Sequence, residues 1–330
     1  MSNHISNELR QQIIDSLIDC LVNNYVFPDK AEEAARHICV KAANHEYDHV
    51  TSGETLASLL NIHMSEVIQD NHLLLQFDPF IRQEHDRVDM EEMRKDMYAH
   101  LAQTNYGFQK VERLQGNIGY IELTNFEDPA VGGETAAAAM NLVANTEALI
   151  FDLRKNGGGT PYMVALLSSY LFEGNVVHLN NIYWREDEST VQTWTLPFVP
   201  GKRYVDKPVY ILTSSQTFSA AEEFTYNLKH LKRATIIGEV TKGGANPCDR
   251  IHLHDHFVAF MPVGCSINPV TGANWEGSGV IPDIEVTANE AFQVAYAEAL
   301  RHVQRLSEGD IHTVHPSVQK EVEERLKSLY

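Results

Sequence analysis

Apolar residues recur at helical spacing along the first 70 residues. Within residues 8–23, every fourth position is apolar, as on one face of a helix. These positions are Leu9, Ile13, Leu17 and Leu21. The stretches DKAEEAARHICVKAANHE and SGETLASLLNIHMSEVIQ repeat the spacing, and Asp29 and Ser52 stand where N-caps of two further helices are expected. The pattern predicts a small three-helix unit, followed by a charged helical segment at about 88–103.

From Asn117 onward, short apolar runs alternate with helical patterns. The expected strands are 117–126, 148–153, 208–213 and 234–239. The expected helices are 132–147, 160–172 and 219–232. This alternation is typical of parallel strands crossed by helices, so the sequence predicts a layered α/β domain. Ligands bind at the carboxyl ends of such strands, and the loops RKNGGGT and SSQTFS both follow such ends, so we expect the two loops to be neighbours.

Ser219 stands at the corner between an expected strand and an expected helix. Glu222 follows three residues later, so SAAE matches a capping box, in which the hydroxyl accepts from a first-turn amide and the carboxylate reaches back. Capping is the commoner role of this motif. The alternative is a nucleophile, because the helix N-terminus favours developing negative charge. A base and a second amide donor elsewhere in the chain would favour the nucleophile.

Three consecutive glycines follow another expected strand, in the stretch DLRKNGGG at 152–159. Glycine adopts positive φ and lets backbone approach a ligand, so an amide there can point at an oxygen atom. The simpler interpretation is a tight turn between strand and helix. A glycine amide and the Ala220 amide of the neighbouring loop would together make a two-donor oxyanion hole.

The composition narrows the classes of function. Hydrophobic residues make up 43% and charged residues 22% of 330 residues, as in globular proteins. The 26 basic and 45 acidic residues give a formal net charge of −19, which argues against nucleic acid or anionic membranes as partners. No secretory signal, membrane-spanning run or metal-type cysteine spacing is evident, so a cytoplasmic location is expected, with secretion of a longer precursor left open.

Three histidines alternate in HLHDHF, at His252, His254 and His256. Alternate residues share one face of a strand, so three imidazoles there could bind a metal ion. No carboxylate or cysteine cluster accompanies them, and a polar strand face is the preferred interpretation. Neither a metal nor a cofactor is expected.

Four motifs, in this order and spacing, resemble those of peptidase family S41, the tail-specific or C-terminal-processing serine peptidases. They are ALIFDLRKNGGG, LTSSQTFSAAEEF, IIGEVTKGGA and WEGSGVIPDIEV, and the resemblance covers most of 117–290. The chain is most similar to the branch of the tricorn core and the interphotoreceptor retinoid-binding proteins. The resemblance implies a crotonase/ClpP-like layered α/β catalytic domain at 81–330, preceded by a small helical N-terminal domain at 1–80. A PDZ domain is not expected, because the segment between Pro79 and Asn117 is too short for one.

The resemblance also implies which residues form the nucleophile and the oxyanion hole. Ser219 takes the place of the nucleophile. The Ala220 amide is one oxyanion donor, and Gly157 or Gly158 supplies the other.

The two branches of the family differ in their general base. The tricorn-like branch uses a histidine, and QDNHLLL supplies His72 at the matching place, with Asn71 instead of the neighbouring serine. The processing-protease branch uses a lysine, but GEVTKGGAN has Gly244 at that position, which leaves Lys242 as an alternative base. The last member of the tricorn-type set is a glutamate, here Glu276 in WEGSGVIPDI.

The resemblance therefore implies a serine peptidase that forms an acyl-enzyme. Imidazole, with an ordinary pKa of about 6.5, can accept the serine proton near neutral pH. Two alternatives stay open: a non-catalytic carrier of retinoids or fatty acids, and acyl-CoA chemistry on a crotonase-like core. Peptide or protein substrates are the expected partners, and a homo-oligomer is left open.

Overall fold

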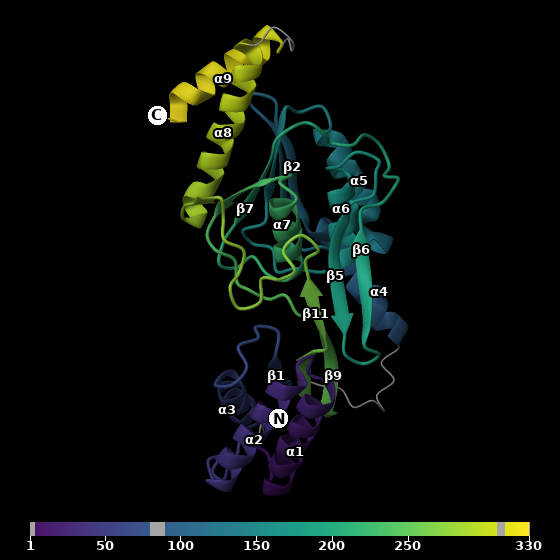
Figure 1. Ribbon diagram of the computed structural model, residues 1–330, viewed down its shortest axis with the longest axis vertical. Helices are drawn as coiled ribbons and strands as arrows, with labels where there is room; N and C mark the ends of the chain where they lie inside the picture. The colour runs from purple at the N-terminus through teal and green to yellow at the C-terminus, as the bar shows by residue number, and fades with distance from the viewer. Residues whose placement is uncertain (1–3, 80–89, 309–313, 330) are drawn as a thin grey trace. The chain divides into compact units, whose positions relative to one another are not determined.

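The computed structural model describes residues 4–79, 90–308 and 314–329, and it divides into two compact units (Figure 1). Each unit is built from separate segments of the chain. The first contains Met1–Arg94, Asn181–Val191 and Gly244–Ile267. The second contains Lys95–Asn180, Gln192–Gly243 and Asn268–Tyr330.

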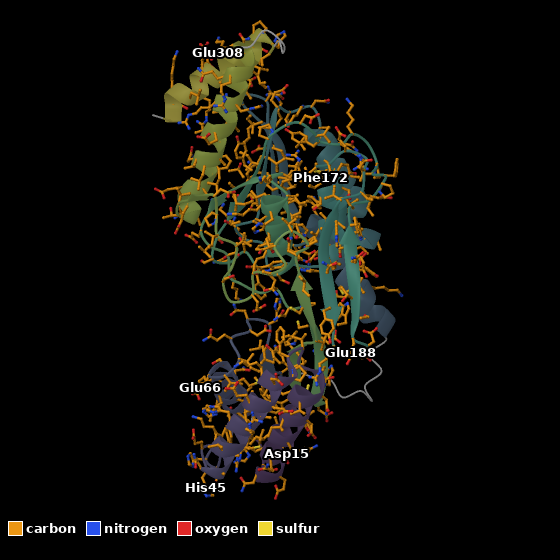
Figure 2. The ribbon with its side chains drawn as sticks, viewed as in Figure 1. Asp15, His45, Glu66, Phe172, Glu188 and Glu308 are labelled. Carbon is orange, nitrogen blue, oxygen red and sulfur yellow. The ribbon has the colours of Figure 1, made fainter. Side chains whose placement is uncertain are left out.

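The first unit combines three helices with a small antiparallel sheet. Its helices are α1 (Asn7–Asn24), α2 (Pro28–Ala43) and α3 (Gly53–Ser65). The sheet has the order β1 (Leu74–Phe77), β10 (Phe257–Pro262) and β9 (Cys248–His254). The apolar face of α1 is buried at Ile13, Leu17 and Leu21, as its spacing predicts. The charged side chains of Asp15 in α1 and of Glu66, directly after α3, are exposed (Figure 2).

The expected helix starts are confirmed for one residue and wrong for the other. The Ser52 hydroxyl accepts a hydrogen bond from the Thr55 amide and caps α3. Asp29 is not a cap, because α2 begins at Pro28 with Phe27 as its N-cap residue. Proline fits the first helical position, where no amide donor is needed, and this moves the helix start ahead of Asp29.

The histidines of HLHDHF do not share one strand face. His252 and His254 lie in β9, but the strand ends at His254, and His256 follows in the turn before β10. The His256 ring is hydrogen-bonded to the Asp78 carbonyl at 3.0 Å, and its centroid is 6.5 Å from that of His254. The strand end therefore breaks the alternation that a three-histidine metal site would need.

The second unit is a layered α/β structure around a six-stranded sheet. The sheet has the order β12 (Ile284–Glu285), β8 (Thr235–Gly238), β7 (Val209–Thr213), β4 (Ala148–Asp152), β3 (Ile118–Leu123) and β2 (Phe108–Leu114). All neighbouring pairs are parallel except β2 with β3. The layered α/β fold with a helical region at the amino end, expected from the sequence, is confirmed.

Helices cover both faces of this sheet (Figure 1). One face packs against α5 (Pro129–Val143), α6 (Pro161–Ser169) and α7 (Ala220–His230). The other packs against α8 (Ala288–Glu308), with α9 (Pro316–Leu329) beside it. All five residues of β4 and of β7 are buried, as expected for strands covered on both sides. The carboxyl ends of these two strands lead directly into the predicted loops.

Five further elements complete the described chain. They are α4 (Met90–Gln103), the 3₁₀ turn η1 (Asn105–Gly107), β5 (His178–Trp184), β6 (Ser189–Trp194) and β11 (Gly264–Ile267). The expected charged helix is α4, and the first two residues of its expected range, 88 and 89, lie outside the described residues. Among the residues that the structure describes, no helix has both the length and the apolar character needed to cross a membrane.

Glu223 is a buried carboxyl group in the first turns of α7 and makes fold stability depend on pH. Burial raises the pKa of Glu223 from 4.5 to about 7, against the smaller opposing effect of the side chains of Asn180 and Asn227. Because the folded-state pKa is raised, this group stabilises the fold fully below pH 4.5, and that contribution is lost as the pH rises through about 7.

We expect Glu223→Gln to become more stable relative to the wild type as the pH rises. The difference in unfolding free energy should shift in favour of the variant by about 3 kcal/mol between pH 4.5 and 8. Urea unfolding of both proteins at the two pH values measures it. An equal difference at both pH values would show that Glu223 does not titrate in this range.

Candidate active site

The backbone of Ser219 differs from that of the serine and threonine residues that cap other helices. Ser6, Ser52 and Thr160 have extended backbone and accept a hydrogen bond from an amide of their helix. Ser219 precedes α7 with φ 56° and ψ −121°. A non-glycine residue in such a sparsely populated region costs about 1–3 kcal/mol, and strain of this kind clusters at active sites. A cap has no need of this strain, whereas a sharp strand-to-helix corner that presents a nucleophile does.

The loop that carries Ser219 and the glycine loop are neighbours, as predicted. We call residues 214–219 the serine corner and residues 154–159 the glycine loop. The Ser214 hydroxyl donates to the Arg154 carbonyl at 2.5 Å, and the Phe218 amide donates to the Asn156 carbonyl at 3.1 Å. A third bond anchors the corner, from the Thr217 hydroxyl to the Leu153 carbonyl at the end of β4. The two loops therefore form one hydrogen-bonded structure at the carboxyl ends of β4 and β7.

Gly158 makes the closest approach between the two loops. Its φ is +113°, and a Cβ there would lie 2.7 Å from the Ser219 Cβ and 3.3 Å from the Ala220 nitrogen. Only glycine fits such a contact without displacing the serine corner. Gly158 thus brings the glycine loop directly against the predicted nucleophile and the predicted Ala220 donor.

Both predicted glycine donors already have acceptors in this structure. The Gly157 amide donates to the Thr124 carbonyl at 3.3 Å, and the Gly158 amide donates to Asn156 Oδ1 at 2.9 Å. To act in an oxyanion hole, either amide would have to break its present hydrogen bond and donate to the substrate oxygen instead. The role assigned to Gly157 or Gly158 stays a prediction.

The start of the glycine loop is fixed by a buried ion pair. Arg154 donates to both carboxylate oxygens of Asp152, which also accepts from the Tyr120 hydroxyl at 2.7 Å. Burial alone would raise the pKa of Asp152, but the hydrogen bonds from Arg154 and Tyr120 and the charge of Arg154 lower it below its ordinary value. The ionised carboxylate therefore holds the loop where it leaves β4.

Glu222 binds the serine corner to a second segment. It is fully buried, and one of its oxygens, Oε2, accepts from the Ser219 amide at 2.9 Å. The other oxygen, Oε1, accepts from the Gly243 amide at 2.6 Å and from the Thr241 hydroxyl. The capping-box spacing predicted the first contact but not the other two.

Lys242 and Glu276 lie in the same unit as Ser219. The exposed Lys242 has its ammonium group 4.3 Å from the centre of the Phe218 ring, beside the serine corner. Glu276 is half-buried in a turn that we call the glutamate turn, residues 274–280. The neighbouring Trp275 is buried and packs against Tyr226 of α7, with 5.2 Å between ring centres. The turn that carries Glu276 is thus fixed on the helix that Ser219 precedes.

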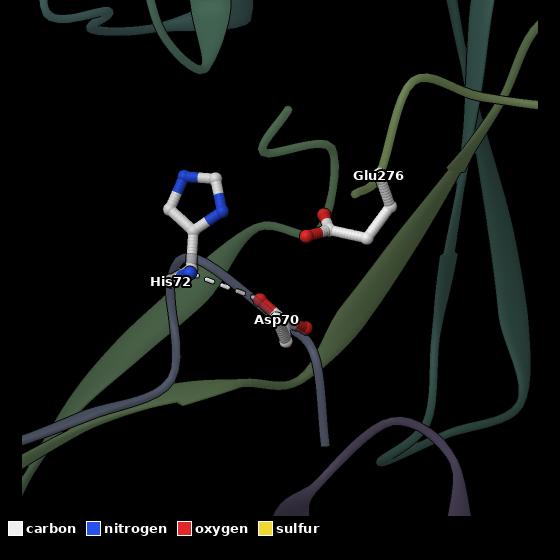
Figure 3. A group of neighbouring side chains, drawn as sticks. All are labelled: Asp70, His72 and Glu276. Atoms are coloured by element: carbon white, nitrogen blue, oxygen red, sulfur yellow. Dashed lines mark hydrogen bonds between the residues drawn. The ribbon is translucent and has the colours of Figure 1, made fainter. Parts of the chain in front are cut away.

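His72 lies in the first unit, in the turn that precedes β1 (Figure 3). Its backbone amide donates to Asp70 Oδ1 at 3.0 Å. Asp70 also accepts from Asn246 Nδ2 at 2.9 Å and from the Tyr25 hydroxyl at 3.3 Å. Burial raises the pKa of Asp70, although these hydrogen bonds oppose the shift. His72 and Ser219 belong to different units, and their pairing stays a prediction.

Two residues that support the site were not predicted from the sequence. Asp70 anchors the turn of His72, and its signal is the Asp-x-His spacing, since aspartate commonly bonds the amide two residues later. Asn156 accepts from the Gly158 amide and donates to the Leu123 carbonyl at 2.9 Å. Its signal is the asparagine directly before the three glycines, a residue type that orders turns through its side chain.

Two models of protein families match the chain. The model described as peptidase family S41 matches residues 117–286, just over half of the 330 residues. The model described as the N-terminal domain of peptidase S41 in eukaryotic IRBP matches residues 6–110. Both matches agree with the resemblance inferred from the four motifs and from the helical amino-terminal region.

Curated relatives are similar over shorter stretches. The chain is 29% identical over 133 residues to the chloroplastic carboxyl-terminal-processing peptidase 2 of Arabidopsis thaliana, which covers 38% of this chain and 24% of that protein. It is 26% identical over 180 residues to a carboxy-terminal-processing protease of Bartonella bacilliformis, with 53% and 40% covered. The chain spans less than half the length of either relative.

Solved structures share the fold over most of the chain. A protein from Parabacteroides merdae, described as a candidate peptidase, aligns with a TM-score of 0.63 and 19% identity and covers 88% of this chain and 96% of that one. The tricorn protease aligns with a TM-score of 0.55 and 14% identity and covers 97% of this chain and 37% of that one. The fold agrees with the match of the family model over half the sequence, and the chain belongs to peptidase family S41.

Proposed function

We propose that this protein is a serine peptidase in which Ser219 is the nucleophile and His72 the general base. The Ser219 oxygen attacks the carbonyl carbon of a peptide bond while its proton passes to His72. The protonated imidazole then gives that proton to the leaving amine as the C–N bond breaks. Water, which gives a proton to His72, then attacks the ester carbonyl; the bond to the Ser219 oxygen breaks, the new carboxyl product leaves, and the Ser219 hydroxyl takes the proton back.

The single observation that carries the proposal is the serine corner. Ser219 has a strained backbone at the N-terminus of α7, and Gly158 packs directly against it. A developing oxyanion there would lie near the positive end of the helix dipole. A carrier of hydrophobic ligands needs neither the strain nor the close glycine, and membership in the peptidase family supports the same conclusion.

The proposal includes cleavage of internal peptide bonds rather than removal of terminal residues. Relatives named as carboxyl-terminal-processing peptidases support peptide or protein substrates. Peptides acetylated at the amino end and amidated at the carboxyl end test this, because an exopeptidase cannot use them. Cleavage of intact casein alongside short peptides would indicate an endopeptidase, and cleavage of the peptides alone would indicate an oligopeptidase.

A fluorophosphonate probe tests the nucleophile. The wild type should be labelled on the peptide that contains Ser219, as located by mass spectrometry, because an activated serine displaces fluoride from the probe. Absence of labelling together with absence of hydrolysis contradicts the proposal. Saturable binding of retinol or a fatty acid without labelling would favour the carrier, and turnover of a CoA ester without labelling would favour acyl-CoA chemistry.

His72→Ala and Lys242→Ala identify the base. We expect turnover to be lost only in His72→Ala, and the wild-type rate to fall at acidic pH, because a protonated imidazole cannot accept the serine proton. Lys242→Ala should keep turnover within about threefold, because the exposed Lys242 beside Phe218 takes no part in the proton transfers of this scheme. Loss of turnover in Lys242→Ala with retention in His72→Ala would assign the base to lysine.

A further inference from the structure

We propose that Glu222 is a positioning residue of the peptidase. Its carboxylate fixes the serine corner and the glutamate turn in one hydrogen-bond network. The inference rests on the proposed function and extends it. Glu222 does not touch the reacting atoms in this scheme. It acts through the backbone of the nucleophile and through the segment that holds the turn of Glu276.

The first half of the network acts on Ser219. The Ser219 amide donates to Glu222 Oε2 at 2.9 Å, which fixes the orientation of the peptide plane before the serine. In this orientation of the peptide plane, Ser219 has its positive φ of 56°. Without the carboxylate, the corner is free to relax toward the extended backbone that Ser6 and Ser52 adopt as caps. Relaxation would move the hydroxyl away from its reactive position.

The second half of the network acts on residues 241–243. Glu222 Oε1 accepts from the Thr241 hydroxyl and from the Gly243 amide. Thr241 and Gly243 are both buried, so these donors have no access to solvent as a substitute partner. A residue that only capped α7 would have no contact with this segment.

Residues 241–243 in turn hold the part of the glutamate turn that follows Glu276. The Thr241 hydroxyl accepts from the Val280 amide at 2.7 Å, and the Gly243 carbonyl accepts from the Gly277 amide at 3.1 Å. Both amides follow Glu276 in the sequence, so Glu276 directly precedes the segment that these hydrogen bonds fix. One carboxylate is thus linked by hydrogen bonds to the backbone of the predicted nucleophile and to the turn of the predicted acidic partner.

The network needs a carboxylate rather than an amide. All the groups that face Glu222 in these contacts are donors: two backbone amides and one hydroxyl. Glutamine would keep one acceptor oxygen and would turn an NH₂ group toward a donor on the other side. Glu222→Gln therefore breaks either the Ser219 half or the 241–243 half while it preserves side-chain volume.

Two variants with matched controls test the positioning role. Glu222→Gln is compared with Glu223→Gln, the same change at the next helical residue, which accepts none of these hydrogen bonds. Thr241→Val removes the hydroxyl that joins Glu222 to Val280 and leaves the Ser219 contact intact. Its control is Thr225→Val, because the buried Thr225 hydroxyl donates to the Ala221 carbonyl within α7 and makes none of the contacts of this network.

The measurements are kcat, KM, the rate of fluorophosphonate labelling and the unfolding temperature, with activity assayed well below the lowest unfolding temperature. We expect kcat and the labelling rate to fall about 100-fold in Glu222→Gln and about 10-fold in Thr241→Val, with KM within about threefold, because small displacements of a nucleophile cost rate rather than binding. Both controls should stay within about threefold of the wild type in all kinetic values.

The outcomes separate the positioning role from the proposed function. A wild type that neither hydrolyses peptides nor is labelled contradicts the proposed function and the positioning role with it. An active wild type with normal kcat in folded Thr241→Val and Glu222→Gln contradicts the positioning role alone. Equal losses of kcat in the test and control variants, in proportion to the decrease in each unfolding temperature, would assign Glu222 to stability only and overturn the proposal. If Glu222→Gln does not fold, the comparison of Thr241→Val with Thr225→Val decides in the same way.

Discussion

Replacement of Ser219 by alanine is expected to lower kcat/KM for peptide hydrolysis by about 10⁴- to 10⁶-fold, the loss typical of a removed serine nucleophile. The residual rate should resemble that left by substrate binding and amide donors alone. The variant should keep the fold, because alanine also carries a Cβ and the Ser219 amide still donates to Glu222. Steady-state kinetics with a blocked peptide and the unfolding temperature measure both effects.

Ser219→Gly separates strain from chemistry at the same position. Glycine is equally inactive as a nucleophile, but it adopts φ 56° without a steric penalty. We therefore expect Ser219→Gly to be about 1 kcal/mol more stable than Ser219→Ala in urea unfolding. If the two variants were equally stable and both kept wild-type turnover, the corner would be an ordinary helix start, and the nucleophile would have to be sought elsewhere.

The sheet could be predicted because its central strands carry the simplest pattern. The runs that became β4 and β7 are continuously apolar, which is the pattern of strands covered on both faces. The edge strand β2 was missed, because its sequence FQKVERL alternates poorly and it is held by antiparallel pairing with β3 rather than by its own apolar face. Helix α8 was not predicted either, although Ala291, Ala295 and Ala299 recur at helical spacing on its buried face, together with Leu300 and Val303.

The candidate site could be predicted as far as residue types and loop order determine it. Parallel strands end at one edge of a sheet, so the meeting of the glycine loop and the serine corner followed from the strand order. The positive φ of Ser219 could not be predicted from the sequence, because a capping box and a nucleophile corner have the same residue types at the same spacing. The second set of contacts of Glu222 did not follow either, since Thr241 and Gly243 are distant from it in sequence.

Gly158→Ala is expected to lower kcat by about 10²- to 10³-fold. The new methyl group would lie 2.7 Å from the Ser219 Cβ and 3.3 Å from the Ala220 nitrogen, in the space in front of the predicted oxyanion donor. The backbone φ of +113° adds strain for any side chain. Steady-state kinetics should show the loss in kcat, and urea unfolding should show a decrease in stability of about 1–3 kcal/mol.

Two other glycines distinguish a local effect from a general cost of adding a methyl group. A Cβ at Gly174 or at Gly157 would meet no atom within 4 Å, and neither residue needs positive φ. Gly174→Ala, outside the site, should keep wild-type kinetics. Gly157→Ala keeps its amide and should lose at least tenfold less activity than Gly158→Ala. If Gly157→Ala instead lost as much as Gly158→Ala, the essential property of the loop would be its freedom to move, and the close contact between Gly158 and Ser219 would not explain the requirement for glycine.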